Sequence, residues 1–334
     1  FKNSVYLKQV IFEQNSELQV IEKDAFSGTM IESFTLPLHV KIIGKNAFYS
    51  CKSLEKFEIP KNAELQTIEN YAFGESSLES IEFSAHAINF GEGCFIGCEN
   101  LKHVEFPVDS EMKVIGDIAF FESGVETVII PPSCTQIKSC AFGNCENLRF
   151  FKIPENSMLQ IVENDAFTGT SIESFIVPLH LTKISIFTFK KCKQLQKVEV
   201  PADCELELIE KGAFSETSIE TLSVLSEKVE LENGWCMETP KLTKIIINPK
   251  NDRYIYFNDQ MILCKSDPRS NEYDVIAFAR RDIKKVIIPN FVKIIGMHAF
   301  NSCQSLQSVE IQNDSKLETI EKYAFSGSSI EKLV

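Results

Sequence analysis

The histidines, the side chains most often used in catalysis, show no spacing that would assemble a catalytic or metal site. The chain has five of them, and none lies in an H-E-x-x-H motif or another metal-ligand spacing. The sequence also lacks a G-x-S-x-G motif, a phosphate-binding glycine loop and a cysteine–histidine signature. We therefore expect a protein that is not an enzyme, with no catalytic residue, cofactor or bound metal.

The cysteines are the second group that could do chemistry, as metal ligands, disulfide partners or nucleophiles. Four of the eleven recur every 47 residues, at Cys51, Cys98, Cys145 and Cys192. If 47 residues make two coils of a stack, their sulfurs lie roughly 10 Å apart, whereas a disulfide needs Cα atoms within about 7 Å. Pairing or metal binding stays open for Cys94 with Cys98 and for Cys140 with Cys145, although no C-x2-C pair of a zinc site is present. We interpret the recurring cysteines as free, small, buried side chains.

A ladder of phenylalanines indicates what positions these side chains. Its members lie alternately 25 and 22 residues apart, and most close a phrase such as IEKDAF, IGKNAF or IENYAF. Cys236 takes the place of one member. The others are Phe1, Phe26, Phe48, Phe73, Phe95, Phe120, Phe142, Phe167, Phe189, Phe214, Phe300 and Phe325. A fixed period of about 20 to 50 residues indicates a repeat solenoid, so we expect these rings to form the core.

Each repeat also carries a strand phrase, apolar-x-x-apolar-x-apolar, often followed by proline, as in residues 54–60 and 172–178. Its period-two alternation turns one set of side chains inward and the other outward. Proline has no N–H to give a neighbouring strand and ends the phrase. We predict a mainly β solenoid of about a dozen coils, alternately 22 and 25 residues long.

The ladder is interrupted between Cys236 and Phe300, which lie 64 residues apart. One rung is lost there, and strand-like runs at 253–257, 261–264 and 273–278 predict a β-hairpin or small meander. We expect one continuous domain: solenoid over 1–248, an inserted β-hairpin island over 249–282 and solenoid again over 283–334. Solenoids need polar capping units, and neither end of the sequence resembles one, so we expect a segment of a longer protein.

The charge of the chain bears on its partners. The formal net charge is −13, with acidic residues scattered through the repeats, which argues against nucleic acid and anionic membranes as partners. No apolar run approaches 18 residues, so we expect no membrane insertion in this segment.

The strand phrase, the I-x-x-x-A-F phrase and a small residue three positions after each phenylalanine carry a family resemblance. Over essentially its whole length the chain resembles BspA-type (treponemal-type) leucine-rich repeat proteins, and its alternating unit lengths and free cysteines resemble the protist members. The resemblance implies an arched solenoid with a parallel sheet on the concave side and an inserted hairpin. The chain departs from the family pattern at Cys236 and in the phrase ISIFTF, and we interpret both departures as local packing variation.

The same resemblance implies a function. Proteins of this kind are known mainly from bacterial and protist surfaces and are implicated in adhesion to host proteins and cells. It implies a protein-binding scaffold at the cell surface or outside the cell, with host or matrix proteins as partners. The alternative is an intracellular structural scaffold of a cytoskeletal or ciliary assembly, which the free cysteines and the single glycosylation sequon at Asn313 favour.

The outward face of the predicted sheet is the candidate binding surface. Most of it is polar, but three neighbouring strands carry Ile129, Phe150 and Ile176, with Thr127 and Ser174 beside them. An exposed aromatic ring between two isoleucines is typical of a protein contact. The alternative is that isoleucine is simply suited to strands, exposed or not.

An acidic stripe is the second candidate on this face. Glu58, Glu82 and Glu105 occupy the same repeat position on successive strand phrases. We interpret the stripe as a surface that could meet a basic partner.

Overall fold

The structure is a computed structural model that describes every residue from 1 to 334. Its regular elements are short β-strands joined by turns, and no part of the chain is helical. The chain therefore contains no helix of the length and apolarity needed to cross a membrane. Its residues form two compact units, Phe1–Ile172 and Glu173–Val334.

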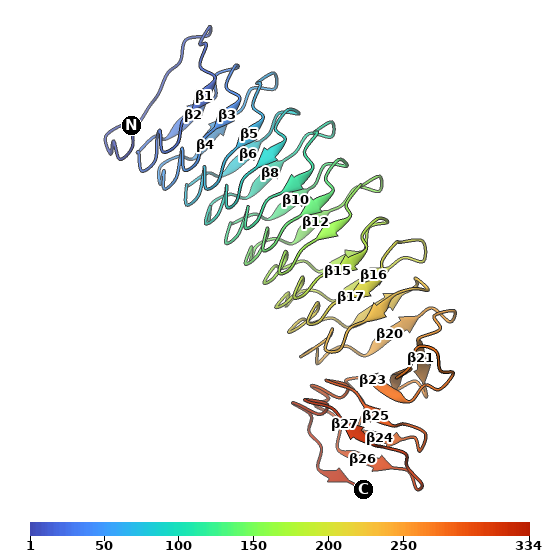
Figure 1. Cartoon of the computed structure of the whole chain (residues 1–334). Coiled ribbons are helices and arrows are strands. Elements are labelled where there is room, and N and C mark those ends of the chain that lie inside the picture. The colour runs from blue at the N-terminus through green and yellow to red at the C-terminus, as the bar shows by residue number, and fades with distance from the viewer. The chain divides into compact units, whose positions relative to one another are not determined.

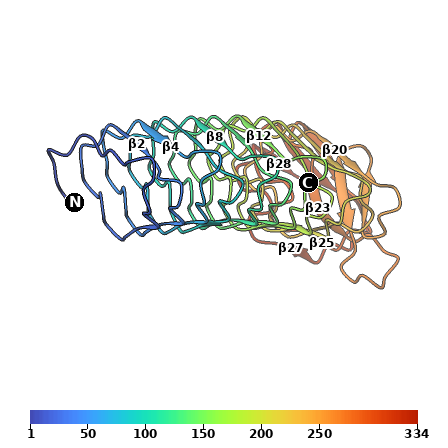
Figure 2. The ribbon, with the colours of Figure 1, turned by 90° about the horizontal axis from the view of Figure 1, so that it is seen from above.

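In the first unit, successive coils contribute strands to two parallel sheets (Figure 1). The seven-stranded sheet contains β1 (Val20–Ile21), β3 (Ile42–Ile43), β5 (Thr67–Ile68), β7 (Asn89–Phe90), β9 (Val114–Ile115), β11 (Gln136–Ile137) and β13 (Ile161–Val162). The six-stranded sheet contains β2 (Ser33–Thr35), β4 (Lys56–Glu58), β6 (Ser80–Glu82), β8 (His103–Glu105), β10 (Thr127–Ile129) and β12 (Phe150–Lys152). In each sheet the strands follow chain order, so each coil stacks directly on the one before it (Figure 2).

The strand phrase of the sequence forms the six-stranded sheet, and its alternation decides which side chains are buried. In β2, β4, β6 and β8 the central residue is buried and the residues on either side are exposed. The inward side chains include Phe34, Phe57 and Val104. The predicted parallel β-solenoid is therefore confirmed.

The phenylalanine ladder lies between the two sheets as a stack of parallel rings. The ring centroids of Phe48 and Phe73 are 5.3 Å apart with an interplanar angle of 4°, and Phe120 and Phe142 are also 5.3 Å apart with an angle of 0°. Side chains of the ladder such as Phe95 are fully buried. The expectation that these rings form the core is confirmed, except at Phe1, which is 72% exposed, and at Phe325, which is only partly buried.

Two left-handed residues bracket the ladder position in successive coils. The residue two before the phenylalanine has positive φ, as at Tyr71 (58°) and Ile118 (48°), and so has the residue two after it, as at Glu75 (56°) and Glu122 (57°). Left-handed backbone turns the chain sharply on each side of the ring, and it disfavours residues other than glycine, asparagine and aspartate.

The recurring cysteines fill small spaces beside the ladder. The thiols of Cys51, Cys98 and Cys145 each donate a hydrogen bond to the carbonyl oxygen of the ladder residue in the preceding coil: the Sγ atoms lie 3.1 Å, 3.0 Å and 2.9 Å from the oxygens of Phe26, Phe73 and Phe120. All eleven cysteines are free. The interpretation of the ladder cysteines as free, buried side chains is confirmed.

The second unit continues the same architecture. One sheet contains β14 (Ser174–Ile176), β16 (Lys197–Val200), β18 (Thr221–Val224) and β20 (Lys244–Ile247), and a second contains β15 (Lys183–Ile184), β17 (Leu208–Ile209) and β19 (Glu230–Leu231). After the interruption of the ladder, the strand phrases of the last coils form a separate sheet. It contains β24 (Lys285–Ile288), β26 (Ser308–Ile311) and β28 (Lys332–Leu333).

The inserted segment forms an antiparallel meander that joins the solenoid. Strand β21 (Tyr254–Phe257) pairs with β22 (Met261–Cys264), which pairs with β23 (Val275–Ala279). Strand β23 then pairs in parallel with β25 (Ile294–Ile295), which pairs with β27 (Thr319–Ile320). The last inserted strand therefore belongs to the repeat sheet, and the insertion is built into the coil stack.

The rung lost from the ladder is replaced by other side chains. Trp235 stands edge-on to Phe214 at a centroid distance of 6.2 Å and lies 5.8 Å from Phe278 of the insertion. The guanidinium of Arg281 is 4.4 Å from the centre of the Phe278 ring. The Arg281 side chain is fully buried, and it donates one hydrogen bond to the carbonyl oxygen of Ala299 at 2.9 Å. A tryptophan, a phenylalanine from the insertion and a buried cation thus fill the space of the missing ring.

Candidate functional site

The exposed face of the six-stranded sheet holds most of the residues that the sequence singled out. Parallel pairing aligns the outward side chains in two rows that cross the strands. In one row Thr127 lies between His103 and Phe150. In the other row Ile129 lies between Glu105 and Lys152.

The apolar part of this face is small but well exposed. Ile129 is 46% exposed and Phe150 is 54% exposed. The two side chains lie on adjacent strands but in different rows, so Phe150 faces Thr127 and Ile129 faces Lys152. Neither side chain packs in the core, whereas Val128, which precedes Ile129 on the same strand, points inward and is buried. They are therefore free to contact another molecule.

The remaining predicted members of the patch lie in the second unit. Ser174 and Ile176 belong to β14, where they pair with Lys197 and Glu199 of β16. Ile176 is 63% exposed. Within the first unit, the structure brings together only Thr127, Ile129 and Phe150.

The acidic stripe is a continuous row on the first unit. Glu82 faces Glu105 directly, and Glu58 lies on β4, the other neighbour of β6. The Thr35 hydroxyl donates a hydrogen bond to Glu58 Oε2 at 3.2 Å. No lysine, arginine or histidine forms an ion pair with any of the three carboxylates.

The equivalent row of the second unit is electrostatically different. There Lys197 Nζ lies 2.9 Å from a carboxylate oxygen of Glu199 on the same strand. Lys285 Nζ lies 3.0 Å from a carboxylate oxygen of Glu310 on the neighbouring strand. Both units carry glutamate at this row position, and ion pairs with lysine form at Glu199 and Glu310 of the second unit, whereas Lys56, on the same strand as Glu58, forms none.

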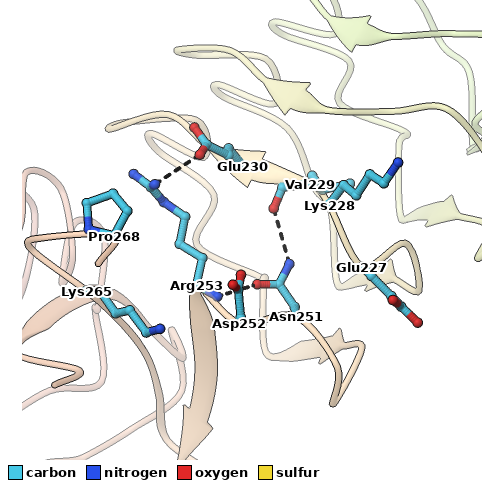
Figure 3. A pocket seen from close by; sticks show the side chains of 9 residues that line it. All are labelled: Glu227, Lys228, Val229, Glu230, Asn251, Asp252, Arg253, Lys265 and Pro268. Carbon is cyan, nitrogen blue, oxygen red and sulfur yellow. Dashed lines mark hydrogen bonds and ion pairs between the residues drawn. The ribbon is translucent and has the colours of Figure 1, made fainter. Parts of the chain in front are cut away.

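An open cavity of about 320 Å³ lies beside the insertion (Figure 3). Arg253 forms an ion pair of 2.9 Å with Glu230 across it, and the Asn251 amide donates to the carbonyl oxygen of Val229 at 3.3 Å. The Asn251 side-chain oxygen also accepts hydrogen bonds from the backbone of Arg253 and Tyr254. These groups fasten the start of the insertion to the coil before it, so the cavity is best explained as a junction. Sequence reasoning did not identify it, because its residues come from a repeat and an insertion with no shared pattern.

The thiols have little capacity for nucleophilic chemistry. Burial raises the pKa of Cys98 to about 11 and that of Cys145 to about 12. Burial also raises the pKa of Cys94, with a further contribution from the neighbouring Cys98. The thiolate is the reactive form, and a raised pKa leaves very little of it at neutral pH. The chain contains no cluster of three or more histidine, cysteine or acidic side chains placed to hold a metal ion.

Comparisons with known proteins agree with this architecture. Residues 19–149, 113–243 and 272–334 match the profile of a family described as BspA type leucine-rich repeat region. A leucine-rich repeat protein from Bacteroides ovatus has a similar crystal structure, with a TM-score of 0.57 and 19% identity, over 95% of this chain and 78% of that chain.

Two further structures are more distant. The pneumococcal vaccine antigen PcpA matches with a TM-score of 0.49 and 17% identity, over 95% of this chain and 84% of that one. A leucine-rich cell surface protein from Faecalibacterium prausnitzii matches with a TM-score of 0.46 and 20% identity, over 95% of this chain and 64% of that one. None of the curated proteins compared with the chain matches its sequence.

Proposed function

Because the chain belongs to the BspA-type leucine-rich repeat family, we propose that it is a non-enzymatic scaffold that binds another protein through the exposed face of its six-stranded sheet. Stacked repeats create an extended, regular surface on which binding residues can be placed. The fold itself supplies no chemistry, so function must come from particular side chains on that surface.

Phe150 is the observation that carries the proposal. Phe150 is 54% exposed on the face of the sheet. The residues that share its row, Thr127 and His103, are polar. Exposed aromatic rings are over-represented among the residues that dominate binding energy at protein interfaces. Ile129 on the adjacent strand enlarges the apolar area that a partner could cover.

We further propose that the protein acts at the cell surface, in adhesion to host or matrix proteins. The support for this proposal is the resemblance of the chain to its family, which implies adhesion at a surface. The alternative is an intracellular structural scaffold, which the eleven free cysteines favour. Antibody labelling of intact and of permeabilised cells separates the two: staining of intact cells supports the adhesion role, and signal only after permeabilisation contradicts it.

The binding surface is tested by substituting Phe150 with aspartate. The chain would be passed over immobilised fibronectin, laminin and collagen in a biosensor, and the variant compared with the wild-type chain. We expect Phe150→Asp to weaken any binding by tenfold or more, about 1.4 kcal/mol, since it buries a charge in the contact. Ile287→Asp is the matched control, because Ile287 is 43% exposed on a strand of the second unit. Equal binding by the Phe150 variant and the wild-type chain would remove this face from consideration.

A further inference from the structure

Both parallel sheets of the second unit are interrupted where the insertion begins, between residues 248 and 249. Before this point, one sheet runs through β14, β16, β18 and β20 and ends at β20, and the other runs through β15, β17 and β19 and ends at β19. After it, β21 and β24 each begin a new sheet. We call this joint the seam, because no strand pairing crosses it.

The hydrophobic core is divided at the same place. The insertion and the coils after it share one cluster of buried apolar side chains, which together with the partly buried residues packed on it lies within residues 255–330. Beyond the seam Phe300 and Phe325 stack with an interplanar angle of 10°. Across the seam Trp235 meets Phe278 at a tilt of 39°. The regular stack of rings thus gives way to one tilted contact.

The hydrogen bonds that cross the seam run mostly through side chains. The Tyr254 hydroxyl accepts a bond from the backbone N–H of Leu231 at 2.8 Å. The backbone contributes a bond from the N–H of Arg281 to the carbonyl oxygen of Leu242 at 3.2 Å. The coils from β14 to β20 are instead joined by continuous backbone ladders. The seam therefore lacks the bonds that make the other joints cohesive.

Two buried polar atoms without a hydrogen-bond partner lie at the seam. One is Nε of Arg281, and the other is Nδ1 of His298, whose ring packs against Gly234. The Arg281 guanidinium is fully buried, yet its hydrogen bonds go to a carbonyl oxygen and two thiol sulfurs and not to a carboxylate. Burial of a cation without an anionic partner costs folding free energy. These groups therefore oppose closure of the seam.

We propose that residues 249–334, the insertion and the coils after it, form a cooperative unit that opens at the seam while the coils before it stay folded. The stability of a solenoid is about the sum of the stabilities of its repeats and of the interfaces between neighbours. A weak interface inside the stack divides it into parts that open separately. The insertion thus gives the solenoid a defined place to open, whatever the exposed sheet binds.

Native-state hydrogen exchange of the whole chain, followed by mass spectrometry at low denaturant concentrations, tests the proposal. We expect the amides of residues 249–334 to share one opening equilibrium constant, about tenfold or more above that of residues 173–248. A gradual rise from coil to coil, with no step at the seam, would mean that the last coils fray one by one. One common constant for residues 173–334 would mean that the seam does not divide the stack. Either result would overturn the proposal.

A pair of tyrosine substitutions shows whether the opening occurs at the seam. Tyr254→Phe removes the hydrogen bond to Leu231, so we expect it to raise the opening constant of residues 249–334 by about threefold or more. Tyr49→Phe is the matched control, because the Tyr49 hydroxyl donates a hydrogen bond of 2.5 Å to Glu75 between two coils of the first unit. We expect the control to change that constant by less than about twofold. Equal effects of the two substitutions would contradict the proposal.

Arg281→Met tests the cost of the buried cation. The Ala299 oxygen keeps a hydrogen bond in this variant, because it also accepts one from the N–H of Ala279. We expect the opening constant of residues 249–334 to fall by about tenfold, since an unpaired buried charge is removed. An unchanged or higher constant would mean that Arg281 does not weaken the seam.

Discussion

At the scale of single residues, the turns around the ladder hold many side chains in a backbone conformation that suits glycine. Glu122 has φ of 57°, its side chain is exposed, and it is bonded only through its backbone, to the oxygen of Gly143. The equivalent positions of other coils carry glycine, as at Gly97 and Gly169. The repeat tolerates the strain at Glu122 because the neighbouring coils fix the turn.

Replacing Glu122 by glycine is expected to stabilise the protein. Relief of left-handed strain is worth about 1–2 kcal/mol, and the greater freedom of glycine in the unfolded chain costs about 0.5–1 kcal/mol, so we expect a net gain of about 0.5–1 kcal/mol. Glu126→Gly is the control, because Glu126 is exposed but has no positive φ. Chemical denaturation measures both variants, and a gain at Glu126 as large as that at Glu122 would contradict the explanation.

His298 introduces a pH dependence at the same kind of position. Burial lowers its pKa, and the nearby positive charges of Lys211 and Arg281 lower it further. As pH falls below the ordinary histidine value of about 6.5, the unfolded chain takes up a proton that the folded chain resists. Stability is therefore unaffected by this group above that pH and decreases as the solution becomes more acidic.

His298→Asn is expected to remove this loss of stability. Asparagine tolerates the left-handed φ of 61° at this position and does not titrate. The free energy of unfolding would be measured from pH 7.5 to 5, and the wild-type chain should lose more stability than the variant. Parallel pH profiles of the two proteins would show that His298 is not the responsible group.

At the scale of the elements, the ladder stabilises the stack through contacts between successive coils. Each ring meets its neighbours face to face at about the spacing of the strands, as between Phe73 and Phe95 at 5.3 Å. At the interruption, Trp235 from the preceding coil and Phe278 and Arg281 from the insertion continue the core with edge-on, tilted and cation–π contacts. Where a repeat unit is missing, the requirement to fill the core remains, and side chains of other types satisfy it.

Truncation of one ring should therefore be costly. Phe95 is fully buried and stacks on Phe73 and Phe120. We expect Phe95→Ala to destabilise the protein by about 3–5 kcal/mol through the cavity it leaves. Val108→Ala is a suitable control, because Val108 is 87% exposed. Urea denaturation measures both, and a near-neutral Phe95→Ala would mean that the ladder is not essential to the stack.

At the scale of the whole molecule, burial governs the chemistry of the thiols. Nine of the eleven cysteines are buried, and only Cys140 and Cys264 are partly exposed. Burial raises the pKa of Cys264 to about 11, and burial with the neighbouring Asp165 and Asp117 raises that of Cys140. The folded chain can therefore retain free thiols without ready oxidation.

Thiol labelling tests this view of the folded chain. With an aromatic disulfide reagent at neutral pH, we expect slow reaction of at most the two partly exposed cysteines and reaction of all eleven in denaturant. The rate for those two should rise with pH, because the thiolate is the reactive form. Rapid modification of more than two thiols in the native protein would contradict the burial of the cysteine ladder.

The sequence by itself determined the coil. The inner repeats place their phenylalanine, strand phrase and small residue in the same environment, so a simple period identifies the inward positions, including Phe34, Phe95 and Cys98. It also placed strands in the insertion near where β21, β22 and β23 occur. These features are local or strictly repeated, and such features can be seen in one chain.

Only the tertiary structure decided which outward side chains meet. The pairing of β10 with β12 sets Phe150 beside Thr127, not Ile129, and Ile176 belongs to the second unit. The ion pairs of Glu199 with Lys197 and of Glu310 with Lys285 depend on side-chain reach, along one strand in the first pair and between two strands in the second. The filling of the missing rung by Trp235 and Arg281 likewise had no periodic signal. Repetition specifies the buried face because packing there is the same in every coil, whereas the exposed face differs from coil to coil and is defined only when the strands pair.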